Sequence, residues 1–175
     1  MTPEALEAGS ALCTECGLCC TGAIHDVAKL DPDELEPARA LGLPVSANRE
    51  RPSFHLPCPK LDAAFCTIYG ERPRVCARYS CRLLDQVREG GRTLDEALPL
   101  VREGQRLARQ AAAFLRPGEG LPATRELLVD GGADNPLLML HGAALAVYMD
   151  RHFRNGREGA WLAQPAVASD DGVKS

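Results

Sequence analysis

Eight cysteines, all in the first half of this 175-residue chain, constrain its fold more than any other feature. Four belong to an N-terminal C-x2-C-x2-CC motif, and four follow within the next sixty-odd residues. The eight are Cys13, Cys16, Cys19, Cys20, Cys58, Cys66, Cys76 and Cys81. Thiolates this close in sequence usually share a metal, because soft ligands select zinc, cuprous copper or iron–sulfur clusters. The sequence therefore predicts metal binding through some or all of these thiols.

The rest of the chain predicts a reducing compartment for these thiols. The segment after Met1 has no basic region followed by an apolar stretch, so we expect no secretion signal. The apolar run from Pro136 to Met149 is too short to span a bilayer, and we expect no membrane segment. A cytoplasmic location follows, in which thiols stay free for metal. Adjacent Cys19 and Cys20 also fit a disulfide framework poorly, because their side chains diverge.

Charge narrows the choice of partner. The formal net charge is −4 and the pI is about 5.6. General affinity for nucleic acid needs a basic surface that neutralises phosphates, so this composition argues against a nucleic-acid partner. A local basic stretch remains between residues 72 and 82, where four arginines occur without an intervening acid.

We expect a mainly α fold with a loop-rich, metal-stapled cysteine region and at most short strands. Residues 1–90 form the predicted cysteine-cluster metal-binding region, and residues 91–160 form a helical region packed on it. Residues 161–175 read as a disordered tail.

Local patterns place the cysteines mostly in loops. Residues 1–22 are predicted to hold the first cluster in a glycine-containing loop, and the alternation over residues 24–30 predicts a short strand. Residues 45–82 are rich in proline and poor in large apolar side chains, so metal would supply much of their folding free energy.

The second half carries clear helix signals. Thr93 and Glu96 form a capping box ahead of a long amphipathic stretch. Residues 122–130 predict a shorter helix. Asn135 followed by Pro136 predicts the start of a mostly apolar helix that runs to about Arg154.

Two kinds of metal site fit the cysteine spacing. Cys13, Cys16 and Cys19 with a remote Cys58-Pro59 match the ligand pattern of a 4Fe-4S cluster. Paired C-x2-C knuckles would instead make tetrahedral zinc sites. Eight thiols suffice for two four-ligand sites, and Cys20 could then face a different site from its neighbour Cys19. The residues do not choose between zinc and iron.

A longer pattern carries a resemblance to a known family. It consists of the N-terminal C-x2-C-x2-CC motif, Cys58-Pro59-x-Leu61, Cys66-x-Ile68-Tyr69-x2-Arg72-Pro73-x2-Cys76, and Cys81. Residues 10–82 thereby closely resemble the YkgJ-type cysteine-cluster family, proposed zinc- or iron-chelating domains whose motif also occurs in flagellin lysine N-methylases. The resemblance implies metal chelation. The family usually has Arg directly after the cysteine at position 76, whereas this chain has Ala77 and then Arg78.

Arginines close to the cysteines suit either metal. Four thiolates around zinc, or a 4Fe-4S core, leave net negative charge, which guanidinium groups offset while they donate hydrogen bonds to sulfur. We therefore expect Arg72 and Arg78 to contact the ligands. Arg154 and Arg157, at the end of the last predicted helix, are expected to be solvated surface residues. His25 and His55 are weaker ligand candidates, because the cysteines suffice.

These observations favour a zinc- or iron-chelating protein with a structural or redox role. No glycine-rich phosphate loop, nucleophile elbow or metalloprotease helix is present in the sequence, which favours a binding protein over an enzyme without deciding the question. One alternative is an electron-transfer enzyme, or enzyme subunit, with a 4Fe-4S cluster. Another is a scaffold whose arginines dock an anionic partner.

Overall fold

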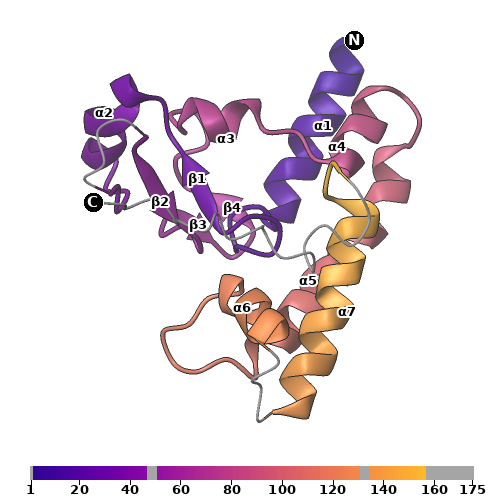
Figure 1. Ribbon diagram of the computed structural model, residues 1–175. Helices are drawn as coiled ribbons and strands as arrows, with labels where there is room; N and C mark the ends of the chain where they lie inside the picture. Colours follow the sequence, from indigo (N-terminus) through magenta and orange to yellow (C-terminus); the bar gives the residue numbers. More distant parts are fainter. Residues whose placement is uncertain (1, 47–50, 131–134, 157–175) are drawn as a thin grey trace, which may run out of the picture.

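The computed structural model describes residues 2–46, 51–130 and 135–156, and it confirms the mainly α fold. These residues form seven α-helices and two small two-stranded sheets (Figure 1). None of the helices found in them has both the length and the apolar character needed to cross a membrane. The tail predicted for residues 161–175 lies outside the described residues.

The first cysteines lie on a helix, which corrects the loop predicted for residues 1–22. Helix α1 (Pro3–Cys16) begins where the Thr2 hydroxyl accepts a hydrogen bond from the amide of Ala5 at 3.3 Å. It ends at Gly17, whose φ of 61° is left-handed. A Cβ on Gly17 would lie 2.8 Å from the carbonyl oxygen of Ala64, so only glycine fits this turn. Cys13 and Cys16 therefore lie on the helix, whereas Cys19 and Cys20 lie in the turns that follow it.

The cysteine half is built from small elements around a second hydrophobic core. The strand predicted in residues 24–30 is confirmed as β1 (Val27–Lys29), which pairs antiparallel with β2 (Ser53–His55). Leu30, Ala38, Leu43 and Phe54 are buried together and pack against Cys58 and Cys76. The other elements are the 3-10 turn η1 (Pro32–Glu34), α2 (Leu35–Ala40), β3 (Leu61–Asp62), β4 (Phe65–Cys66), which pairs with β3, and α3 (Arg74–Arg78).

Polar contacts join the start of α3 to η1. The Glu34 carboxylate accepts a hydrogen bond from the backbone amide of Arg74 at 2.7 Å, at the first residue of α3. The Arg74 guanidinium also pairs with Asp31 at 3.0 Å and with Asp33. These contacts orient the helix that carries Cys76.

The second half is helical, as predicted. The Thr93–Glu96 capping box opens the long helix α5, and the Asn135 side chain caps the start of α7. The last helix ends at His152, two residues before the predicted end. Helices α5 and α7 lie side by side, and α6 packs against α7 (Figure 1). The elements are α4 (Arg82–Arg88), α5 (Leu94–Ala112), α6 (Pro122–Asp130) and α7 (Pro136–His152).

One hydrophobic core joins the cysteine-bearing segment to these helices. Leu12 and Leu18, which flank the first cysteines, are buried in the same cluster as Val101, Leu145 and Phe153. The side-chain amide of Gln105 on α5 donates hydrogen bonds to the carbonyls of Glu15 and Cys16, at 2.8 and 2.9 Å. The end of α1 is therefore held against α5 by apolar packing and by the hydrogen bonds from Gln105, which also provide partners for carbonyls at the end of the helix.

Arg154 is part of the interior, which corrects its prediction as a solvated surface residue. Its guanidinium pairs with Asp150 at 2.6 Å, and the two side chains are only 12% and 5% exposed. It also donates hydrogen bonds to the carbonyls of Ala23 at 2.6 Å and Ile24 at 3.0 Å. The end of α7 is thus tied to the loop that follows the first cysteines. Arg157 lies outside the described residues.

Candidate metal centre

Backbone geometry brings the two cysteine groups of the sequence together. The left-handed turn at Gly17 reverses the chain after Cys16, and its carbonyl accepts a hydrogen bond from the amide of Cys20 at 2.9 Å. The carbonyl of Cys20 in turn accepts one from the amide of Cys58 at 2.8 Å. Segments that are nearly forty residues apart in sequence therefore meet at Cys20.

All eight thiols line two neighbouring cavities. The larger cavity has a volume of about 270 Å³ and the smaller one about 90 Å³. Cys58 lines only the larger, whereas Cys13, Cys16 and Cys81 line only the smaller. The four thiols at the boundary line both, and these are Cys19, Cys20, Cys66 and Cys76. The fold thus concentrates every cysteine of the chain in one region.

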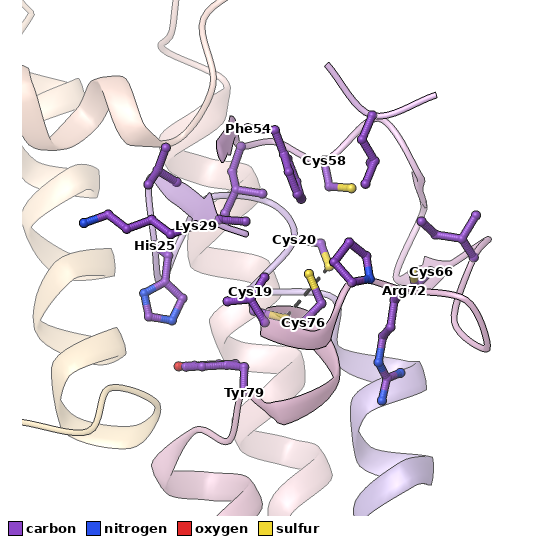
Figure 2. A pocket seen from close by; sticks show the side chains of 17 residues that line it. Cys19, Cys20, His25, Lys29, Phe54, Cys58, Cys66, Arg72, Cys76 and Tyr79 are labelled. Carbon is purple, nitrogen blue, oxygen red and sulfur yellow. Dashed lines mark hydrogen bonds between the residues drawn. The ribbon is translucent and has the colours of Figure 1, made fainter. Parts of the chain in front are cut away.

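Cys19 and Cys20 stand where the two cavities meet. Their Sγ atoms lie 3.9 Å apart (Figure 2). In the same view, the sulfurs of Cys20, Cys58 and Cys76 surround one end of the larger cavity, and Tyr79 and His25 stand at its other side. The hydrogen bond between the adjacent thiols lowers the pKa of Cys19 and raises that of Cys20, because only one of the two thiols can readily ionise.

Electrostatic coupling and position in the cavities suggest two groups of thiols, and Cys19 is coupled to both of them. Burial raises the pKa of Cys13, of Cys16 and of Cys81, the last to about 11. Negative charge on neighbouring thiolates raises these pKa values further. Charge on Cys19, Cys81 and Cys13 raises the pKa of Cys16. Charge on Cys13 and Cys19 raises the pKa of Cys81. We call Cys13, Cys16, Cys19 and Cys81 the first thiol group.

The pKa values of the remaining cysteines are raised by burial and by one another's charge. Burial raises the pKa of Cys58, and it raises the pKa of Cys76 to about 12. Charge on Cys19, Cys58 and Cys66 raises the pKa of both Cys20 and Cys76, so Cys19 is coupled to these thiols as well. We call Cys20, Cys58, Cys66 and Cys76 the second thiol group. Thiolates so close together repel one another unless a cation neutralises them, which is the condition that a soft metal satisfies.

The chemistry of these donors fits zinc or iron, because both bind cysteine thiolates. Among the described residues, no three Cys, His, Asp or Glu side chains already converge on one point as metal ligands. The cysteines are half-buried rather than enclosed, and none is in a disulfide.

Two arginines approach the thiols. The Arg72 guanidinium lies 3.6 Å above the centre of the Tyr69 ring, and Arg72 lines both cavities. Arg88 lines the smaller cavity, and its charge, like that of Arg72, opposes the rise in the pKa of Cys13 that burial and Cys19 cause. The buried Nε–H groups of Arg72 and Arg88 have no hydrogen-bond partner within the described part of the chain.

Arg88 was missed in the sequence, whereas Arg78 was expected here. Arg78 is exposed at the end of α3 and lines neither cavity. Cys81 is the N-terminal cap of α4, and Arg88 follows it by two helical turns, which places both on one face. That seven-residue spacing is the signal that could have revealed Arg88.

The two histidine candidates differ in position. His25 packs edge-on against Tyr79, with ring centroids 4.5 Å apart, and lines the larger cavity. His55 is exposed on β2 and lines neither cavity.

The sequence around these cysteines matches a known protein family. Residues 12–94 match the CxxCxxCC family model, described as "Putative zinc- or iron-chelating domain". The matched segment contains all eight cysteines and ends at the first residue of α5. No significant match is found among curated proteins or among solved structures. Residues 12–94, just under half of the chain, are therefore similar to the CxxCxxCC family of zinc- or iron-chelating domains.

Proposed function

We propose that this chain is a zinc-binding protein in which two four-cysteine sites have a structural role. The observation that supports it most directly is the gathering of eight thiols around two neighbouring cavities. Sites with four cysteine ligands leave no open position for a substrate, so they are typical of structural rather than catalytic zinc.

The proposed ligand sets are the two thiol groups. Cys13, Cys16, Cys19 and Cys81 would bind one ion, and Cys20, Cys58, Cys66 and Cys76 the other. Cys58 lines only the larger cavity, away from Cys13 and Cys16. This position speaks against the ferredoxin-type set of Cys13, Cys16, Cys19 and Cys58. Zinc is the metal proposed here because closed four-cysteine sites are typical of structural zinc.

Elemental analysis of anaerobically purified full-length protein tests the choice of metal. We expect colourless protein with two zinc ions per chain. Brown protein that contains iron and acid-labile sulfide would contradict the zinc assignment and support the electron-transfer alternative.

Substitution of one cysteine from each group tests the division into two sites. We expect Cys81→Ser to lose the ion of the first group and Cys58→Ser that of the second, so that each variant retains one zinc. The double variant should retain none. Metal content after gel filtration is the measurement. Loss of all metal in either single variant would indicate one shared site instead.

The arginines beside the thiols should strengthen metal binding. Removal of a group that hydrogen-bonds a metal ligand commonly costs ~10–100-fold in affinity. We therefore expect Arg72→Ala and Arg88→Ala to lower zinc affinity by about that factor, as measured by competition with a chromogenic chelator.

Arg78→Ala is the matched control for this comparison. Arg78 lies between Cys76 and Cys81 in sequence, but its side chain is exposed and lines neither cavity. Its removal should leave zinc affinity close to that of the wild type. Equal affinities in all three variants would show that the arginines do not act on the thiols.

A further inference from the structure

The larger cavity is lined by cysteines at one end and by apolar side chains over most of the rest of its surface. Cys20, Cys58 and Cys76 occupy one end of it. The remaining surface is mainly hydrocarbon from β1, β2 and the segments around them, so the second hydrophobic core opens into this space. The main apolar residues that line it are Val27, Ala28, Leu43, Phe54, Leu56 and Val75.

The volume exceeds what a metal ion needs. Protein interiors are close-packed, with few voids larger than a water molecule. An enclosed apolar cavity of about 150 Å³ is known to stay dry and to bind benzene, and the space here, which is partly open to solvent, is about 270 Å³. An ion held by the second thiol group would occupy the thiol end and leave the hydrocarbon end open. Pockets with such walls are the usual binding sites of small apolar molecules.

The charges around the larger cavity limit the kind of molecule that it can bind. Four thiolates around a divalent ion keep net negative charge, which repels an anionic ligand. The apolar walls offer little to a cation, and no Asp or Glu stands among the described residues that line the cavity. The side-chain ends of Lys29 and Arg72 point away from its centre (Figure 2). We therefore expect the ligand of this cavity to be uncharged.

We propose that the larger cavity is a binding site for a small uncharged apolar molecule, held between the second thiol group and the second hydrophobic core. The thiol end of this site rests on the proposed function, because it assumes that metal occupies that group. The ligand packs against Phe54 and Val75 and lies beside the metal–thiolate unit, without bonding to it.

Fluorobenzene is the probe that tests the proposal. The zinc-loaded full-length chain is titrated with it, and binding is followed by ligand-observed ¹⁹F NMR with toluene as the competitor. We expect saturable binding that toluene reverses. Ala28→Leu and Val75→Phe each fill the cavity from a different wall, and each should weaken binding by about tenfold or more while zinc content is unchanged. Ala144→Leu, on the exposed face of α7, is the control that adds the same volume as Ala28→Leu outside the cavity.

The possible outcomes separate this proposal from the metal assignment. Zinc content is measured on every sample, so a chain without zinc contradicts the proposed function whatever the probe does. No saturable binding to the zinc-loaded wild type overturns the ligand site. Binding to metal-free protein alone also overturns it, because the metal would then fill the cavity. Unchanged affinity in a folded Ala28→Leu or Val75→Phe variant would place the probe elsewhere and overturn it as well.

Discussion

Removal of metal from the intact chain should unfold residues 10–82 while α5 and α7 keep part of their helical structure. The second hydrophobic core has only four buried apolar side chains among the described residues, and β1 to β4 contain two or three residues each. Structural zinc contributes about 10–16 kcal/mol in small modules, which matches or exceeds the total stability of a typical domain. Hydrogen exchange by mass spectrometry, before and after chelation, is the measurement.

Two samples control this experiment. Protein treated with chelator that is already saturated with zinc should keep its native exchange pattern, and addition of zinc to the stripped protein should restore that pattern. Exchange in residues 10–82 that remains unchanged after complete metal removal would contradict the structural role. Uniform unfolding of both halves would show instead that the shared core around Leu12 and Leu18 makes the chain one cooperative unit.

The sequence predicted the elements whose signals are local. Thr93 with Glu96 and Asn135 with Pro136 combine a cap, a favourable first turn and an apolar period, and both helices formed. Helix α1 has the same kind of start at Thr2 and Pro3, but the cysteines and glycines near its end obscured it. The chain leaves the helix only at Gly17, where the close approach of Ala64 demands glycine. That contact joins residues far apart in sequence and has no local signal.

The candidate metal centre, too, could be predicted from the sequence only in part. Spacing identified the eight cysteines as candidate ligands, but it did not show which of them share a cavity. Cys81 lies near Cys13 because α1 packs on α4, and Cys58 lies near Cys20 through a backbone hydrogen bond. Both contacts depend on tertiary packing. Arg88 lines the smaller cavity for the same reason, since it lies on α4, which packs against α1. Its side chain runs close to Gly9 of α1, where an added Cβ would lie 3.1 Å from the Arg88 Nε atom.

Arg154→Ala should destabilise the metal-loaded protein by about 3–5 kcal/mol, because it leaves the carboxylate of Asp150 buried without its partner. The same change removes the donors to the carbonyls of Ala23 and Ile24, in the loop directly after Cys19 and Cys20. We therefore expect weaker zinc retention as well, although Arg154 lines neither cavity. Urea unfolding followed by circular dichroism measures the first effect, and chelator competition measures the second.

Arg151→Ala is the matched control, since Arg151 is an exposed arginine on the same turn of α7. Its loss should change the free energy of unfolding by no more than about 0.5 kcal/mol. The double variant Asp150→Ala/Arg154→Ala should be less destabilised than the sum of the two single variants, because no buried charge is then left unpaired. Equal stabilities of Arg154→Ala and Arg151→Ala would contradict an interior role. A stability loss in Arg154→Ala without loss of zinc would confine that role to α7 and separate it from the cysteine loop.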